Sequence, residues 1–281
     1  MNEHTTPAHL LPPLTVVMTT WAPTGPDGYR RATNARMTLG TWQHRLVYEG
    51  PLYLHIADDG SALPDYPASI VEYPGNFLET TYSRQERHGV GASLNAGFRQ
   101  AHDLRGGLVL YAVDDWLLLE QFDVSPWARL LVERPEVGMV RLGPPHPDLT
   151  GRIEALTAEW QGWGLRLDRH HYAFGHRPAL YHQRMRDAYG PFAEDVNAYE
   201  CERLYAERWA RGFLTEPGIV LALPHPWLHV SGPEFAGIEP AGAAVARLGH
   251  GWVYPRPDGA KARCGGPAIC SLCKAEAEAL R

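Results

Sequence analysis

The sequence has few cysteines, no long apolar run and no strong net charge, and each absence excludes a class of protein. Four cysteines in 281 residues are too few for a disulfide scaffold. No apolar run approaches the roughly 18 to 20 residues of a membrane-spanning helix, and the N-terminus lacks the regions of a signal peptide. A net charge of −6 gives no general attraction to nucleic acid or anionic membrane. We therefore expect a soluble cytoplasmic protein.

The composition is otherwise that of a globular protein with many loops. Apolar residues make up 44% and charged residues 21%, which is ordinary globular usage, and the length suits one large domain with a small appendage. Residues 1–13 are a polar, proline-containing lead-in, and the chain becomes rich in glycine, alanine and proline near its end. We expect a domain over 14–235 and a C-terminal extension over 236–281.

Runs of apolar residues alternate with helical patterns along the first half of the chain. Strands are expected at 14–19, 52–57, 69–73, 108–115, 137–142 and 219–223, and helices at 30–46, 89–102, 125–133 and 197–211. Ser125 is the expected hydroxyl cap of the third helix, with Pro126 in its first turn. This alternation predicts an α/β fold with a mostly parallel sheet and helices on both faces.

Polar clusters follow two of the expected strands. Asp114 and Asp115 end the strand from 108, and Asp58 and Asp59 follow the strand over 52–57. Ligands bind at the carboxyl edge of open α/β sheets. Adjacent carboxylates repel each other when they lose solvent, so a divalent cation that also holds phosphates is the expected partner. With the glycine-rich segment RHGVGASLNAGF at a helix start, these clusters predict a site for a nucleoside diphosphate.

Taken in order, these segments resemble the inverting family-two glycosyltransferases of the GT-A fold. TVVMTTW resembles their first strand and turn, HIADDGS their nucleotide-binding turn, and RHGVGASLNAGFRQA their Gly-to-Asn helix. YAVDDW stands where they carry an aspartate-any-aspartate metal motif, and YAFGHRPALYHQRMRDAYGPFAED resembles their acceptor-side wall. The resemblance covers roughly 14–230. It implies a nucleotide-sugar-binding half over 14–142 and an acceptor-side half over 143–235.

The resemblance also implies an activity and a set of residues. The activity is metal-dependent, inverting transfer from a nucleoside-diphosphate sugar, by family prevalence a UDP-sugar, to a hydroxyl group. The sequence does not select the acceptor, which is a small metabolite, a glycan or a hydroxylated nucleobase. The implied nucleotide-sugar-binding residues are Thr19, Thr20, Trp21, Asp58, Asp59, Arg87, Asn95 and Asp114. The implied ligands of Mn²⁺ or Mg²⁺ are Asp115, Asp114 and His229, although Val113 replaces the first aspartate of the motif.

Three carboxylates are candidates for the catalytic base that takes the proton of the acceptor hydroxyl. The family usually carries Glu-Asp in this segment, and placing Glu202 at that aspartate brings Arg208 onto an arginine that commonly follows. Glu202 is therefore the first choice. Glu200 is second, and its position three residues after Asn197, that of a capping box, weakens it as the base. Asp195 is third.

Other interpretations remain open. Asp58 and Asp59 are also typical turn formers, and Arg87 could be a surface partner of Glu86. A nucleotidyltransferase can share this kind of sheet, although the loop after the first strand lacks a compact glycine-lysine signature. A non-catalytic nucleic-acid-binding protein is a third alternative, because residues 241–281 carry six Lys or Arg against three Asp or Glu.

The C-terminal extension has a cysteine pattern of its own. Cys270 and Cys273 have the spacing of a zinc knuckle, Cys264 could be a third thiolate, and His250 is the nearest imidazole. Such a zinc ion would be structural, because thiolates would fill its coordination. The alternative is three free thiols on a frayed tail.

Overall fold

The computed structural model describes most of the chain. The described residues are 11–71, 75–142, 152–155, 162–166, 175–211, 218–222, 226–230, 254–255 and 261–262, and every structural statement below concerns these alone. The predicted zinc ligands His250, Cys264, Cys270 and Cys273 lie outside the described residues. The zinc knuckle therefore stays a prediction.

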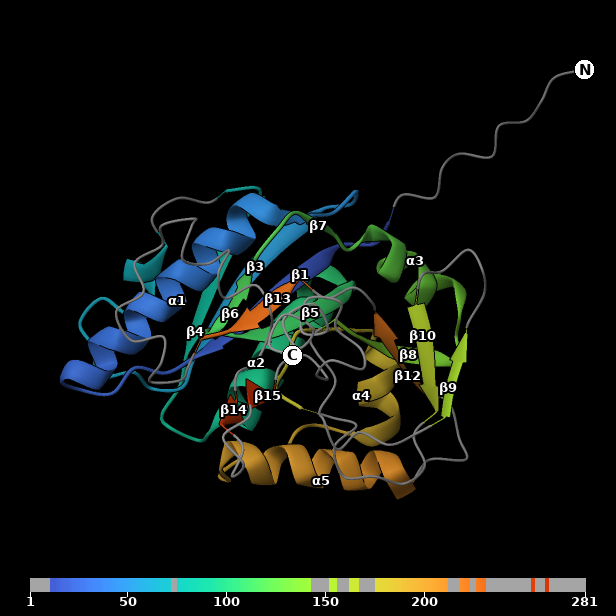
Figure 1. The fold of residues 1–281 in the computed structure, drawn as a ribbon. Coiled ribbons are helices and arrows are strands. Elements are labelled where there is room, and N and C mark those ends of the chain that lie inside the picture. The colour runs from blue at the N-terminus through green and yellow to red at the C-terminus, as the bar shows by residue number, and fades with distance from the viewer. Residues whose placement is uncertain are drawn as a thin grey trace, which may run out of the picture.

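The elements alternate as the sequence indicated (Figure 1). The helices are α1 (Pro26–Arg45), the 3-10 turn η1 (Ala68–Ile70), α2 (Val90–Arg105), α3 (Ser125–Glu133), α4 (Gln183–Tyr189) and α5 (Ala198–Arg211). The strands of the main sheet are β1 (Leu14–Thr20), β3 (Leu52–Asp58), β4 (Thr80–Arg84), β5 (Leu108–Val113), β8 (Val137–Arg141), β9 (Arg152–Ala155), β10 (Gly162–Arg166), β11 (Ala179–Tyr181) and β12 (Gly218–Ala222). Short pairs are formed by β2 (Leu46–Val47) with β7 (Phe122–Asp123), β6 (Trp116–Leu118) with β13 (Trp227–His229), and β14 (Tyr254–Pro255) with β15 (Lys261–Ala262).

One nine-stranded sheet forms the centre of the molecule, in the order β4-β3-β1-β5-β11-β8-β12-β10-β9. The strands β4, β3, β1 and β5 are parallel neighbours, and β8 and β12 are also parallel. Between these two groups β11 runs antiparallel to both β5 and β8. The prediction of a mostly parallel sheet is confirmed, and β1 and β5 each lie between two other strands, as expected of strands that are buried on both faces.

Helices cover both faces of this sheet, as predicted. Residues of α1 and α3 pack in one apolar core, and residues of α2, α4 and α5 pack in a second core on the opposite face. Successive residues of one strand serve the two cores in turn, because side chains alternate across a strand. Val16 and Met18 of β1 belong to the first core, whereas Val17 between them belongs to the second.

Two local predictions were wrong. The expected strand over 69–73 is absent from its described part, where η1 forms instead, and the strand that extends the sheet beside β3 is β4. Ser125 does not cap α3, because it already lies inside the helix. Its hydroxyl accepts a hydrogen bond from the Glu49 N–H (2.9 Å), while the Asp123 carboxylate accepts from the Ser125 N–H (2.9 Å). No helix in the described part of the chain has the length and apolarity needed to cross a bilayer.

The buried imidazole of His55, on β3, makes the fold sensitive to acid. Its Nδ1 lies 2.9 Å from Thr81 Oγ1 and its Nε2 lies 2.9 Å from Ser83 Oγ. Burial, with a smaller contribution from the charge of Arg105, lowers the pKa of His55 to about 4. Between the two pKa values the unfolded chain therefore binds a proton at this histidine and the folded chain does not. The free energy of unfolding is therefore fully present above the ordinary histidine pKa and decreases as the pH falls below it.

We expect this histidine alone to remove about 3 kcal/mol of unfolding free energy between pH ~6.5 and pH ~4. Urea unfolding across this interval measures the loss in the wild-type protein and in His55→Gln, which cannot titrate. The variant is expected to lose distinctly less stability over the same interval. Equal losses in the two proteins would show that the His55 pKa is not depressed.

Candidate functional site

A cavity of about 550 Å³ lies where the carboxyl ends of β1 and β5 meet the start of α2 and the residues just before α5. This is the edge of the sheet at which open α/β folds bind ligands. The cavity is lined by Thr19, Thr20, Trp21, Arg31, Asp59, Arg87, His88, Gly89, Val90, Ser93, Val113, Asp114, His176, Asp195, Val196, Asn197 and Ala198. It therefore collects polar side chains from widely separated parts of the sequence.

Six of the eight residues that the resemblance placed at the nucleotide sugar border this cavity. They are Thr19, Thr20, Trp21, Asp59, Arg87 and Asp114. The other two, Asp58 and Asn95, do not line it. Their side chains are buried and hydrogen bonded within the protein, which gives them a structural position in place of an expected ligand contact.

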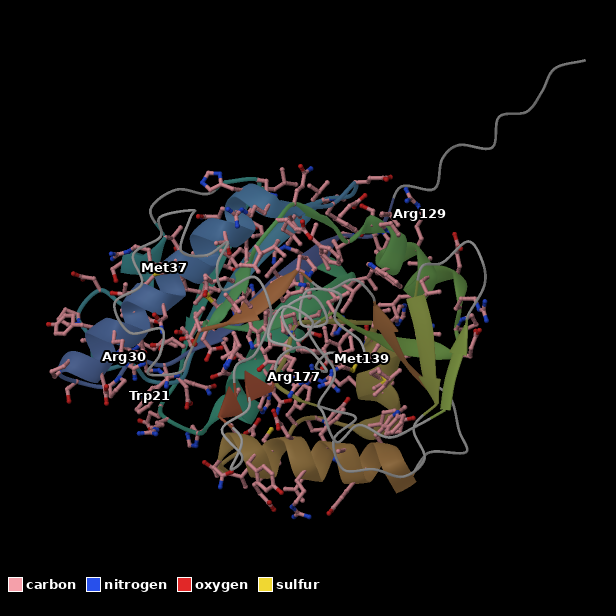
Figure 2. The ribbon with its side chains drawn as sticks, viewed as in Figure 1. Trp21, Arg30, Met37, Arg129, Met139 and Arg177 are labelled. Carbon is pink, nitrogen blue, oxygen red and sulfur yellow. The ribbon has the colours of Figure 1, made fainter. Side chains whose placement is uncertain are left out.

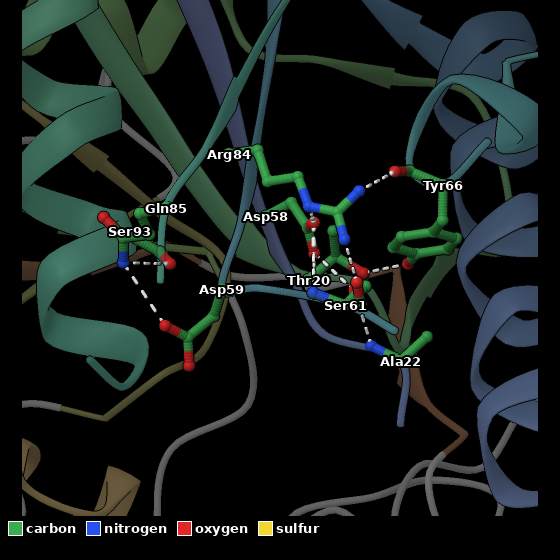
Figure 3. A network of polar contacts seen from close by, with 9 residues as sticks. All are labelled: Thr20, Ala22, Asp58, Asp59, Ser61, Tyr66, Arg84, Gln85 and Ser93. Atoms are coloured by element: carbon green, nitrogen blue, oxygen red, sulfur yellow. Dashed lines mark hydrogen bonds and ion pairs between the residues drawn. The ribbon is translucent and has the colours of Figure 1, made fainter. Parts of the chain in front are cut away.

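Asp58 fixes the turn that follows β3 (Figure 3). Its carboxylate accepts hydrogen bonds from both the N–H and the hydroxyl of Ser61, and its Oδ2 lies 3.5 Å from the Arg84 Nε. Burial raises the pKa of Asp58, and the bonds to Ser61 oppose that rise. This is the arrangement of a turn-forming aspartate, with its oxygens facing the chain rather than the cavity.

Asp59 holds the segment that leads into α2. Its carboxylate accepts hydrogen bonds from the N–H groups of His88 (2.9 Å) and Gly89 (3.0 Å) and from the Gln85 side-chain amide (3.3 Å). The same amide bonds to Ser93 Oγ, as Figure 3 shows. Hydrogen bonds from successive backbone N–H groups to one carboxylate hold the segment in place. Asp59 thus positions the cavity wall that carries Arg87 and His88.

Asn95 ties α2 to the segment before α5. Its amide donates to the Phe192 carbonyl (3.0 Å) and to Glu194 Oε1 (2.8 Å), and its oxygen accepts from the Phe192 N–H (2.9 Å). Nearly all of its hydrogen-bonding capacity is therefore used, which is unlike a residue kept ready for a ligand.

Replacing Asn95 by alanine leaves the N–H and carbonyl of Phe192 without these partners. We expect a loss of about 2–3 kcal/mol of unfolding free energy, because a buried polar group without a partner costs its desolvation. Urea denaturation measures this loss of unfolding free energy. Asn197→Ala is the matched control, since the Asn197 side chain accepts only one exposed N–H, that of Glu200, and a lost helix cap costs about 1 kcal/mol. Equal losses would contradict the structural role of Asn95.

Two arginines and a tryptophan form the positively charged wall of the cavity. The Arg87 guanidinium lies 3.8 Å from the centre of the Trp21 ring, and that of Arg31 lies 5.3 Å from it. The Arg31 Nε also donates to the Trp21 carbonyl (2.7 Å). Figure 2 shows Trp21 at the same end of α1 as Arg30. Arginine on an aromatic face is held in place yet keeps donors for an anion.

Asp114 also lines the cavity and is buried. Its Oδ2 accepts the hydroxyl of Thr20 (2.5 Å), which in turn is hydrogen bonded to the Tyr66 hydroxyl. Burial, and after it the charge of the adjacent Asp115, raises the pKa of Asp114 to about 7. The two acids expected at the end of the β5 strand thus lie together in a low-dielectric position.

Asp115 faces His229, the third predicted metal ligand. β6 and β13 pair so that His229 stands opposite Trp116, and the Asp115 Oδ2 lies 3.2 Å from His229 Nε2. The Val230 N–H donates to the Asp115 carbonyl (2.9 Å). Two residues separated by more than a hundred positions are therefore brought together by the fold.

The Asp115–His229 pair has the chemistry of part of a metal site. Asp115 Oδ1 is buried and has no hydrogen-bond partner among the described residues. Carboxylate oxygen and imidazole nitrogen are suitable ligands for Mn²⁺. No three His, Cys, Asp or Glu side chains of the described residues form a complete metal site, and Asp114 is engaged with Thr20. The residues present fit a divalent ion whose remaining ligands are phosphate oxygens and water.

The three candidate bases occupy different environments. Glu202 does not line the cavity, and its Oε1 accepts the N–H of His176 (2.5 Å). Glu200 also lies outside the cavity lining, and its carboxylate is paired with the Arg203 guanidinium (2.6 and 2.7 Å). Asp195 alone lines the cavity, with its Oδ1 2.6 Å from His88 Nδ1. The geometry therefore favours the third choice from the sequence over the first two.

Some lining residues were not singled out from the sequence, chiefly Arg31, His88 and Ser93. His88 stands inside the segment RHGVGASLN, directly before the glycine that opens α2. Its place at a predicted helix start beside the nucleotide motif was the available signal. Arg31 carries no such signal, because its position depends on the hydrogen bond from its Nε to the Trp21 carbonyl, which the sequence does not reveal.

No family model and no curated protein matches the sequence. Solved structures do match. S. aureus TarS 1–349 has a TM-score of 0.52 at 16% identity, over 76% of this chain and 59% of that one. Its complex with UDP-GlcNAc has a TM-score of 0.52 at 14% identity, over 84% and 64%. GalNAc-T7 with UDP, GalNAc and Mn²⁺ has a TM-score of 0.52 at 13% identity, over 95% and 54%. The chain thus spans about three fifths of these proteins, and it has the GT-A fold of these glycosyltransferases.

Proposed function

We propose that this protein is a metal-dependent inverting glycosyltransferase that uses a nucleoside-diphosphate sugar, in the first place a UDP-sugar. The observation that carries the proposal is the grouping of Asp114, Asp115 and His229 at the carboxyl end of β5, beside a cavity walled by two arginines. A nucleoside diphosphate presents the complementary chemistry, namely a phosphate pair with an affinity for both metal and guanidinium. The likeness to TarS with UDP-GlcNAc and to GalNAc-T7 with UDP supports the choice of uridine.

The donor would lie with its diphosphate between the arginine wall and the acidic pair. Arg31 and Arg87 would donate to phosphate oxygens, and Asp115 with His229 would hold Mn²⁺ or Mg²⁺. Such an ion, when bound, neutralises the charge that develops on the departing diphosphate. Thr20, itself hydrogen bonded to Tyr66, would hold the Asp114 carboxylate in place at the cavity.

Inverting transfer is a single displacement. The oxygen of the acceptor hydroxyl attacks the anomeric carbon while the bond from that carbon to the diphosphate oxygen breaks, and the electron pair leaves with the nucleoside diphosphate. The hydroxyl proton needs an acceptor at the cavity. Asp195 is the candidate carboxylate that lines it, and its 72% exposed side chain leaves room for an acceptor molecule.

A thermal-shift panel tests this proposal on the wild-type protein. The ligands are UDP-GlcNAc, UDP-GalNAc, a GDP-sugar, ATP and a DNA oligonucleotide, each with and without Mn²⁺. We expect a UDP-sugar to stabilise the protein only when Mn²⁺ is present, by about 2.7 kcal/mol at a hundredfold excess over the dissociation constant. Stabilisation by ATP alone would favour the nucleotidyltransferase, and stabilisation by DNA alone would favour the nucleic-acid-binding alternative.

A further inference from the structure

His88 and Asp195 form a close pair at the wall of the cavity. The His88 Nδ1 lies 2.6 Å from Asp195 Oδ1, and the Asp195 N–H donates to the His88 carbonyl (2.8 Å). Both side chains line the cavity, with 48% and 72% of their surfaces exposed. The pair is therefore linked twice, once through the backbone and once through the side chains.

The backbone of His88 is held in place from outside the pair. The Asp59 carboxylate accepts the His88 N–H (2.9 Å), which fixes the backbone of the histidine to the end of β3. Asp195 adopts a left-handed backbone (φ 58°), a region that aspartate enters more readily than most residues other than glycine. The side-chain pairing thus belongs to a pre-organised arrangement.

We propose that His88 and Asp195 form a proton-accepting dyad, in which His88 Nε2 takes the proton of the acceptor hydroxyl and Asp195 orients the ring. This inference rests on the proposed glycosyl transfer. A carboxylate beside Nδ1 selects the tautomer with the proton on Nδ1, which leaves a lone pair on Nε2. Nε2 makes no hydrogen bond to the described residues, so it is available to a hydroxyl group in the cavity.

The step balances without any further reactant. The acceptor oxygen forms its bond to the anomeric carbon, the bond to the diphosphate oxygen breaks with its electron pair, and the hydroxyl proton moves to His88 Nε2. The imidazolium that results is stabilised by the Asp195 carboxylate. Because the His88 side chain is half exposed, the proton can then pass to solvent. An imidazole is the ordinary side chain whose basicity matches proton transfer near neutral pH.

The charges around the imidazole are consistent with this role. Asp195 raises the pKa of His88 through the hydrogen bond and through its charge, and Glu86 and Asp59 add smaller contributions. Arg87, the neighbouring cation, lies over the Trp21 ring. The enzyme is therefore expected to become active as the pH rises through a value above the ordinary histidine pKa of about 6.5.

Hydrolysis of UDP-GlcNAc and UDP-GalNAc in Mn²⁺, with water as the acceptor, tests the dyad. We expect His88→Ala to lower kcat by about 10²–10³-fold with little change in the donor KM, to lose the rising limb of the pH profile, and to regain part of the rate with added imidazole. Asp195→Asn should also lower kcat, because it disturbs the tautomer. His44→Ala, an exposed histidine of α1 outside the cavity, is the matched control and should leave the rate unchanged.

Nitrogen-15 NMR of the imidazole gives an independent measurement. We expect neutral His88 to carry its proton on Nδ1 in the wild-type protein and to lose that preference in Asp195→Asn. A His88→Ala variant with the wild-type rate, or a proton found on Nε2, would overturn the dyad while leaving glycosyl transfer intact. Failure of the wild-type protein to hydrolyse either donor would instead overturn the proposed function, and the nitrogen spectra would still decide whether the pair exists.

Discussion

Replacing Asp115 by alanine is expected to abolish Mn²⁺-dependent binding of a UDP-sugar and to lower the transfer rate by about 10³-fold. The reason is the position of the carboxylate, which has one oxygen 3.2 Å from His229 Nε2 and the other buried without a partner among the described residues. Alanine removes the ligand that pairs with the imidazole and leaves His229 unable to hold a divalent ion alone. Calorimetric titration of UDP-GlcNAc with and without Mn²⁺ measures the binding, and release of UDP measures the rate.

This loss should occur without any loss of stability. The charge of Asp115 contributes to the raised pKa of Asp114, so its removal relieves repulsion between two acids in a buried position. The melting temperature of Asp115→Ala without ligand should equal or exceed that of the wild-type protein. Asp103→Ala, an exposed carboxylate of α2 outside the cavity, makes the same change in charge and should leave metal-dependent binding intact. Undiminished metal-dependent binding in Asp115→Ala would place the ion elsewhere.

The central strands were predictable because they are buried on both faces. A strand in that position is a short run of mostly apolar and β-branched residues, as at Leu14–Thr20 and Leu108–Val113, and its shortness and β-branched content favour a strand over a helix. The edge strand β4 is polar and only partly buried, so its sequence, TTYSR, has no such run. We predicted the strand at 69–73 instead, where Ile70 ends a 3-10 turn packed against α1 and Val71 follows it. Pairing with β3, which the sequence does not reveal, is what makes β4 a strand.

The site was predictable to the extent that strand ends define it. The positions of Asp59 and Asp114 follow from where two parallel strands stop, because the carboxyl ends of such strands meet at one edge. The direction in which each side chain points cannot be inferred from where the strands end. Asp58 turns toward Ser61, and Asn95 reaches a segment almost a hundred residues away. These partners are fixed by tertiary packing, which a local pattern does not contain.

The choice among the three candidate bases likewise could not be made from the local sequence. Glu202 and Asp195 lie seven positions apart, and only the fold decides which of them borders the cavity. The decision is made where the segment before α5 crosses the first turn of α2. Asp195 lies in that crossing, whereas Glu202 lies on α5 and turns toward the His176 N–H. A sequence motif placed by spacing alone could not distinguish them.

Gly91→Ala is expected to disturb this crossing and to abolish the proposed transfer activity. A Cβ at Gly91 would lie 1.9 Å from the Ala193 carbonyl oxygen and 2.8 Å from its carbon. Backbone atoms cannot rotate aside, so the segment before α5 must move away from α2, and Asp195 moves with it. We expect a loss of about 1–3 kcal/mol of unfolding free energy. We also expect activity of the folded protein to fall by about 10²-fold, the usual effect of displacing a reacting group by an ångström.

Gly107→Ala separates the effect on the site from the effect on stability. A Cβ at Gly107 would meet the Pro13 carbonyl oxygen at the same 1.9 Å. Gly107 precedes β5, at the edge of the sheet opposite the cavity, so its clash displaces none of the lining residues. Urea unfolding should show similar losses for the two variants, whereas UDP-sugar hydrolysis, normalised to folded protein, should fall only in Gly91→Ala. Equal activity in both would show that the contact between α2 and the segment before α5 does not position the catalytic groups.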